Sequence, residues 1–409
     1  MKLTQQFTNK NYLFSSSYLL FFYAAWSLWW SFYAIWLKTK LGLSGVELGM
    51  LYSTNQLISM VYMVCYGIMQ DKLGTRKVII WFQGFVLLLT GPFLIYAYEP
   101  LLLSSFKVGV VIGGLFLGAG FIAGCALTES FVEKLSRKFN FEYGTARMWG
   151  SFGYAVGALV GGICFSINPH INFWFVSIMG ILFIMINIFY KINIDEEERS
   201  QVKSIKMNDI LAVFKTTQFW CFVLFIIGTM SFYNVYDQQL FPVFYTQHFA
   251  DINDGYKVYG YLNSFQVFLE AAGMCVAPFL INRIGAKTAL LSAAAIMATR
   301  MLGSAVFTDV YLISFIKLLH AAEVPLFMVS IFKYIVANFD SRLSSTIFLI
   351  GFKISSSVGV IILSSPVGKL FDMFGYHSTF YILAAIVTTI IVVSVFTLSN
   401  KKIVTTASA

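Results

Sequence analysis

The sequence predicts an all-α membrane protein whose twelve transmembrane helices form two pseudo-symmetric six-helix bundles. Three observations lead to this fold class. Hydrophobic residues make up 58% of the 409 residues and charged residues only 11%, whereas a soluble domain carries about 25% charged residues. Apolar runs of the length that spans a bilayer, about 20 residues, recur along the whole chain. One long polar segment divides these runs into two equal sets.

The apolar runs define the expected spans. They cover residues 12–37, 46–69, 78–98, 108–132, 147–166, 172–190, 219–245, 259–281, 288–307, 311–335, 344–366 and 378–398. The first run has the full length of a span, so we expect an uncleaved first helix rather than a signal peptide. The polar segment 191–218 then separates an N-terminal bundle, 1–190, from a C-terminal bundle with a short cytoplasmic tail, 219–409.

The distribution of Lys and Arg predicts the orientation. With the N-terminus inside, most basic residues lie on the cytoplasmic side, and the positive-inside rule then places both termini in the cytoplasm. The net charge of +9 follows from this topology and from anionic lipid, so no nucleic-acid partner is needed. The five cysteines all lie in apolar runs, which argues against a disulfide framework. No cofactor or metal is expected.

A repeated loop indicates that the two halves are related. The segment Asp71-Lys72-Leu73-Gly74-Thr75-Arg76-Lys77 follows the second span, and Asn282-Arg283-Ile284-Gly285-Ala286-Lys287 follows the eighth. In both, Gly allows a tight turn and the cations suit a face where helix C-termini and lipid phosphates are negative. We interpret Asp71, Gly74, Arg76 and Lys77 as a cytoplasmic gating loop, and an ordinary basic turn that occurs twice by chance is the alternative. The first of these loops is typical of the major facilitator superfamily, whose two bundles enclose a central cavity.

Ionisable residues inside the spans point to function, because each costs about 2.5–3.5 kcal/mol near the bilayer centre. Four are basic and four are acidic, and one is a histidine: Arg147, Arg300, Lys317, Lys353, Glu129, Asp237, Glu270, Glu323 and His320. Lys317, His320 and Glu323 are spaced by three residues and share one side of a helix. We interpret His320 and Glu323 as a proton site, and a buried structural cluster is the alternative.

Glu129 and Arg147 remain open on periodicity alone. The spacing Glu129, Glu133, Arg137 also fits surface pairing along one helix. An Arg, a carboxylate and an aromatic ring would equally suit a sugar, with Ser151 and Tyr154 on the helical face of Arg147. Trp30 in the first span is either a packing residue or a second stacking platform.

Four strings identify a family resemblance. They are Asn140-Phe-Glu-Tyr-Gly-Thr-Ala-Arg-Met148, Tyr233-Asn-Val-Tyr-Asp-Gln-Gln239, Leu319-His-Ala-Ala-Glu-Val-Pro325 and Arg342-Leu-Ser-Ser-Thr-Ile-Phe348. They resemble the oligosaccharide:proton symporter family over essentially the whole chain. The strings 26–36 and 261–267 resemble its sucrose-transporting branch.

The resemblance implies a sugar-binding pair, Glu129 and Arg147, and a stacking ring, Tyr154. It also implies a role in proton coupling for Glu323, His320 and Arg300, and an interhelical ion pair between Asp237 and Lys317. The full set of expected sugar-binding residues is Glu129, Arg147, Tyr154, Ser151, Cys125, Trp30, Glu270, Gln266, Asn263 and His320.

Three departures separate the chain from the lactose-transporting branch. The lactose-transporting branch has an acidic residue in span eight at the position of Val267. In this chain the acidic residue, Glu270, lies one turn later. A second ion pair would need charges at Asn234 and Ser356, which are both neutral. Tyr154 stands where that branch has a Trp. Separately, the family pattern gives Lys353 no partner, and Glu270 and Asp237 are the candidates for one.

We therefore expect a bacterial inner-membrane symporter, not an enzyme, that imports sucrose with a proton by alternating access. The alternatives are a symporter for raffinose, maltose or a galactoside such as lactose or melibiose, and an uncoupled facilitator. The expected partners are the sugar, the proton and membrane lipid, and we expect a monomer. A membrane enzyme would need a nucleophile with a base, or a metal site, and the spans supply neither pattern.

Overall fold

The computed structural model describes residues 9–73, 76–191, 213–339 and 343–399, and these residues form helices without a β-strand. The chain divides into two compact units. Unit 1 comprises Met1–Ser200 and Pro242–Phe268, and unit 2 comprises Gln201–Phe241 and Leu269–Ala409. Most of the expected linker 191–218 lies outside the described residues.

Unit 1 begins with the most buried span, the helix α2, which π-helical turns (η1) extend. It ends with the first part of a helix that both units share, α14. Its elements are α2 (Lys10–Ile35), η1 (Trp36–Lys40), α3 (Gly45–Leu73), α4 (Val78–Pro92), η2 (Phe93–Tyr98), α5 (Glu99–Ser104), α6 (Phe106–Leu117), η3 (Gly118–Ile122), α7 (Ala123–Lys138), α8 (Tyr143–Ile167), α9 (Pro169–Phe189), α13 (Phe241–Thr246) and the start of α14 (Ile252–Ile284). The grouping of 242–268 with this unit differs from the expected bundle 219–409 and follows from close packing. A Cβ atom on Gly260 would lie 2.7 Å from the carbonyl oxygen of Ala158 in α8.

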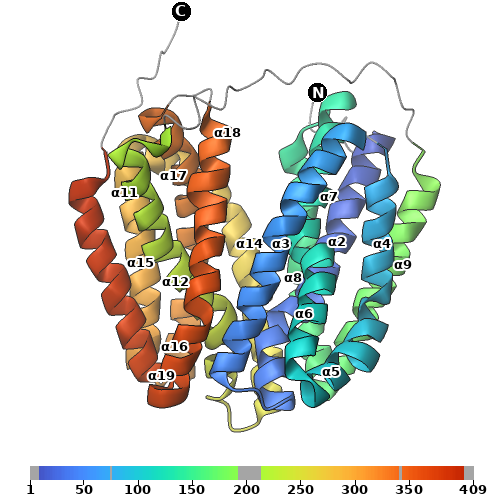
Figure 1. Cartoon of the computed structure of the whole chain (residues 1–409), viewed down its shortest axis with the longest axis horizontal. Helices are drawn as coiled ribbons and strands as arrows, with labels where there is room; N and C mark the ends of the chain where they lie inside the picture. The colour runs from blue at the N-terminus through green and yellow to red at the C-terminus, as the bar shows by residue number, and fades with distance from the viewer. Residues whose placement is uncertain (1–8, 74–75, 192–212, 340–342, 400–409) are drawn as a thin grey trace, which may run out of the picture. The chain divides into compact units, whose positions relative to one another are not determined.

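Unit 2 contains the remaining helices. They are α11 (Thr217–Ile226), η5 (Ile227–Ser231), α12 (Phe232–Val235), η6 (Tyr236–Leu240), the rest of α14, α15 (Ala286–Val306), α16 (Val310–Leu318), α17 (His320–Asn338), α18 (Ser344–Ile347), η8 (Phe348–Ile354) and α19 (Ser355–Thr397). At Gly375 the backbone of α19 has φ 74° and ψ −177°, a conformation that favours glycine. Figure 1 shows the chain reversing within α19, which therefore contains two spans, orange-red and then red.

The twelve expected spans each coincide with a helical segment. Nine segments in the described residues are long and apolar enough to cross a membrane, or ten with the bent helix α14. One of the nine, Phe348–Thr397, is the pair of spans that Gly375 joins. Among the described helices, α3 is not one of these segments, and it carries Ser53, Thr54, Asn55 and Gln56 in succession. Asn55 is fully buried.

The glycine-rich run of the fourth span lets helices approach closely, as small residues do in membranes. A Cβ atom on Gly114 would lie 2.7 Å from Ile58 Cδ1, and one on Gly118 would lie 2.9 Å from Ser59 Oγ. These glycines therefore pack α6 and η3 against α3.

Candidate functional site

An ion pair joins Glu129 of α7 to Arg147 of α8 in unit 1. Arg147 Nε lies 2.5 Å from Glu129 Oε1, and about a third of each side chain is exposed. Tyr23 of α2 donates to the same oxygen at 2.6 Å, and its ring centroid lies 4.1 Å from Arg147 Cζ. Tyr23 thus supports both members of the pair, and sequence analysis missed it. Its spacing of seven residues from Trp30 on one helical face was the available signal.

The structure shows which ion pairs form in the run that begins at Glu129. Glu133 pairs with Arg137 at 2.7 Å as an ordinary i, i+4 pair on the surface of α7. Glu129 instead turns to Arg147 on the neighbouring helix. An accessible carboxylate with a guanidinium offers planar, charge-assisted hydrogen bonds of the kind that suits adjacent sugar hydroxyls.

Two further expected residues adjoin this pair, and a third lies farther along the same helix. The Cys125 thiol lies 3.0 Å from the Tyr23 hydroxyl, and Ser151 accepts a hydrogen bond from Arg147 Nη1 at 3.3 Å. Tyr154 lies farther along α8 and accepts a hydrogen bond from Ser31 of α2 at 3.4 Å. One helical face of α8 therefore carries Arg147, Ser151 and Tyr154, as the spacing predicts.

The remaining unit 1 residues of the expected sugar site lie on α14 and α2. Asn263 of α14 donates to Ser31 at 3.2 Å, and the Oε1 atom of buried Gln266 has no hydrogen-bond partner in the described part of the chain. The ring of Trp30 stacks on Tyr33 with an interplanar angle of 13°. One face of this indole is thus occupied by protein.

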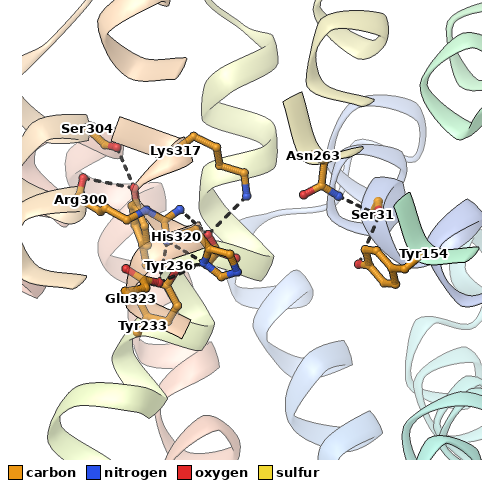
Figure 2. Close-up of polar contacts among 11 residues, drawn as sticks. Ser31, Tyr154, Tyr233, Tyr236, Asn263, Arg300, Ser304, Lys317, His320 and Glu323 are labelled. Carbon is orange, nitrogen blue, oxygen red and sulfur yellow. Dashed lines mark hydrogen bonds and ion pairs between the residues drawn. The ribbon is translucent and has the colours of Figure 1, made fainter. Parts of the chain in front are cut away.

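In unit 2, Arg300 of α15 connects the acidic residues of two neighbouring elements (Figure 2). Its Nη1 donates to Glu323 Oε1 at 2.9 Å and its Nη2 to Asp237 Oδ1 at 2.7 Å. Arg300 and Glu323 are fully buried. Asp237 lies in η6, and such π-helical turns are frequent at functional sites.

His320 completes this cluster at the first residue of α17. Its Nδ1 lies 3.0 Å from Arg300 Nη1, 3.0 Å from Glu323 Oε1, and in contact with the Tyr233 hydroxyl. A ring nitrogen either accepts a hydrogen bond or donates one. It can therefore accept from Arg300 or donate to an ionised Glu323, but it cannot do both. The proton arrangement of His320 is therefore linked to that of Glu323. Sequence analysis missed Tyr233, although it lies one helical turn before Asp237.

The expected pair of Asp237 and Lys317 is only part of a larger arrangement. Lys317 Nζ lies 3.5 Å from Asp237 Oδ1, the oxygen that also accepts from Arg300. Asp237 thus serves two cations, and the shorter distance is to Arg300. The helix breaks at Leu319, between Lys317 at the end of α16 and His320 at the start of α17, yet both side chains still face the same cluster.

Comparisons with known proteins show the family of the chain. The model of the LacY proton/sugar symporter family matches residues 4–409. The chain belongs to this family. The chain is 56% identical to a sucrose permease of Escherichia coli over 402 residues, which cover 98% of this chain and 97% of that protein. A raffinose permease of Escherichia coli is 35% identical, with coverage of 96% and 94%.

Membership of the LacY symporter family makes the chain a multi-pass protein of the inner membrane and a transporter, not an enzyme. Solved structures support the fold. The nucleoside transporter NupG has a TM-score of 0.80 at 12% identity, covering 95% of this chain and 99% of that one. A D-xylose–proton symporter has a TM-score of 0.67 at 14% identity, covering 95% and 97%.

Within this LacY-family chain, the two neutral positions meet. Asn234 Nδ2 donates to Ser356 Oγ at 3.3 Å, so a neutral hydrogen bond stands where the lactose branch is expected to have a charged pair. Glu270 is half-buried on α14 and belongs to unit 2. Lys353 is exposed in η8, and its ammonium lies 5.3 Å from the Phe352 ring centroid.

Each of the two repeated loops supplies a lysine that caps a helix of its own unit. Lys77 Nζ donates to the carbonyl oxygens of Asn187 and Tyr190 at the end of α9, both at 2.5 Å. Lys287 Nζ donates to those of Val395 and Leu398 at the end of α19, both at 2.7 Å. Both lysines therefore contact a helix C-terminus, which agrees with the electrostatic interpretation of these cations, and the gating role of the loop stays a prediction. Of the other expected loop residues, Gly74 and the Asp71 side chain lie outside the described residues, and Arg76 is exposed.

Replacing Lys77 by Met should lower the thermal stability of the purified protein without abolishing the fold. The change removes two charge-assisted hydrogen bonds from a helix C-terminus, where a cation contributes about 0.3–2 kcal/mol. Thermal unfolding in detergent measures the effect, and Lys287→Met should give a loss of similar size in unit 2. Lys107→Met, at an exposed lysine in the first turn of α6, is the control. Equal melting temperatures for all three variants and the parent would contradict this capping role.

Proposed function

We propose that the chain imports sucrose together with a proton by alternating access. The observation that supports it most is the coexistence of two clusters in one chain. A partly exposed acid–base pair, Glu129 with Arg147, is accessible to a sugar, and a buried cluster around Glu323 is suited to holding a proton. The 56% identity to a sucrose permease supports sucrose as the sugar.

In this proposal Arg147 and Glu129 hold the sugar. The guanidinium donates to sugar oxygens, and the carboxylate accepts from a hydroxyl while it keeps its contact with Arg147. Ser151 lies within reach of Arg147 Nη1 and can exchange that contact for the sugar. The ring of Tyr154 is assigned to the apolar face of a pyranose.

Glu323 is the assigned proton carrier, because its two oxygens differ. Oε1 accepts from Arg300 and adjoins His320. Oε2 is buried and has no hydrogen-bond partner among the described residues. A proton on Oε2 leaves the contacts of Oε1 in place and removes the cost of an unsatisfied buried oxygen charge. Protonation of Glu323 leaves Asp237 as the carboxylate that faces both cations of the cluster, Arg300 and Lys317.

Transport in cells tests the proposal. We expect uptake of radiolabelled sucrose to exceed equilibration, to fall to equilibration with a protonophore, and to be accompanied by alkalinisation of a weakly buffered medium. A competition panel of raffinose, maltose, lactose and melibiose ranks the alternative sugars. Uptake that is unaffected by the protonophore and leaves the medium pH unchanged would identify an uncoupled facilitator instead.

We also propose that both termini are cytoplasmic and that the monomer is the transporting form, without a cofactor.

A further inference from the structure

Three helices of unit 1 meet closely around Ser31. A Cβ atom on Gly153 of α8 would lie 2.2 Å from the Leu20 carbonyl oxygen of α2, and one on Gly157 would lie 2.6 Å from that of Ala24. The contact of Gly260 with α8, described above, holds the start of α14 against the same helix. The backbones around Ser31 are therefore held close together. Hydrogen bonds between side chains then determine which polar atoms of these helices are directed away from Ser31.

The hydroxyl of Ser31 joins polar groups from all three helices (Figure 2). It accepts from Asn263 Nδ2 at 3.2 Å and donates to the Tyr154 oxygen at 3.4 Å. Ser27, one turn earlier on α2, lies 3.3 Å away. A serine hydroxyl has a single hydrogen, and because Tyr154 receives it, Ser27 must donate to Ser31.

This single hydrogen sets the polarity of both neighbours. Because the amide NH2 of Asn263 is directed at Ser31, its Oδ1 atom is directed elsewhere as an acceptor. Because the Tyr154 oxygen accepts from Ser31, its own hydrogen points away as a donor. If Ser31 donated to Asn263 instead, both assignments would reverse. Ser31 itself is 6% exposed, so it acts through these two residues.

We propose that Ser31 is a positioning residue that sets sugar selectivity, by fixing Asn263 as a hydrogen-bond acceptor and Tyr154 as a donor. An acceptor and a donor together match two hydroxyl groups of a sugar ring, and reject a sugar whose hydroxyl configuration breaks one contact. The inference rests on the proposed sugar transport, and it adds a residue that contacts no sugar itself.

The test compares Ser31→Ala with the parent in counterflow transport, for each sugar of the competition panel that the parent accepts. Loss of one orienting hydrogen bond should raise the KM for the preferred sugar about threefold to tenfold. The maximum rate should stay within twofold, and the KM ratio between sugars should shift. Ser31→Thr keeps the hydroxyl and should restore the ratio. Ser16→Ala, which removes another buried hydroxyl from α2, is the matched control and should change neither value.

A second variant covers the case in which Thr does not fit between the helices. In Asn263→Asp the carboxylate cannot donate, so Ser31 must donate to it and release Tyr154. The KM ratio should then shift as it does in Ser31→Ala, and the combined Ser31→Ala/Asn263→Asp variant should show less than the sum of the two effects.

Two results would overturn the inference: an equal loss for every sugar, or additive effects in the combined variant. Failure of the proposed proton-coupled transport would give a different result from failure of the inference about Ser31. In that case the parent accumulates no sugar with protons, whereas the comparison of KM ratios still proceeds with any sugar that the parent exchanges.

Discussion

Replacing Glu323 by Gln is expected to abolish sugar accumulation against a gradient while sugar exchange is retained. Gln has nearly the same shape and keeps an oxygen that can accept from Arg300 and adjoin His320, where Glu323 Oε1 now does. It has no site for a transferable proton, so the variant is fixed in a state that resembles the protonated carboxyl. The step that couples sugar to protons is then lost.

Two assays separate these effects. Accumulation of labelled sugar in energised cells should fall to equilibration, a loss at least as large as the accumulation ratio of the parent. Counterflow in preloaded vesicles should proceed at a rate close to that of the parent. Glu133→Gln is the matched control, because Glu133 is an exposed carboxyl paired with Arg137, and it should leave both assays unchanged. A Glu323→Gln protein that still concentrates sugar would assign the proton to another residue.

Replacing Arg147 by Lys should abolish measurable sugar binding even though the charge is kept. Arg147 reaches Glu129 through Nε, Ser151 through Nη1 and the face of Tyr23 through its planar group. A lysine ammonium is a compact charge and cannot make these contacts together. Loss of two hydrogen bonds to a charged group, at about 1.5–3 kcal/mol each, weakens binding by at least about a hundredfold.

Isothermal titration of the purified protein with the preferred sugar measures this loss. Arg137→Lys is the control, because Arg137 makes one exposed i, i+4 pair and such a pair contributes about 0.3–0.5 kcal/mol. It should bind sugar as the parent does. Sugar affinity of Arg147→Lys within tenfold of the parent would show that the guanidinium fork does not hold the sugar.

The spans and the fold class could be predicted from the sequence because burial in lipid demands long apolar runs. The structure adds what periodicity does not encode. The chain reversal at Gly375 needs a positive φ angle, and the grouping of 242–268 with unit 1 depends on close approach at Gly260. The apolar runs 344–366 and 378–398 already predict a reversal between them, but the apolar pattern shows neither the residue that makes this turn nor the grouping of 242–268 with unit 1.

The site shows the same division. Charged residues in spans stand out in a sequence, and Arg147, Arg300 and Glu323 were found in this way. The neutral residues that orient them, Tyr23, Tyr233 and Ser31, were missed, because tyrosine and serine are common in apolar helices and carry no charge signal. The dual role of Asp237 was also missed, since sequence spacing suggests pairs and does not show that one oxygen serves two cations.

The hydrogen bond between Asn234 and Ser356 bears on how this family diverged. A lone carboxylate in place of Asn234, or a lone ammonium in place of Ser356, would enter the membrane without its counter-charge, at a cost of several kcal/mol. A protein that carries only one of the two charges is therefore expected to be less stable than a protein that carries both or neither. We therefore expect the two positions to change together, because either single change would leave a charge in the membrane without its partner.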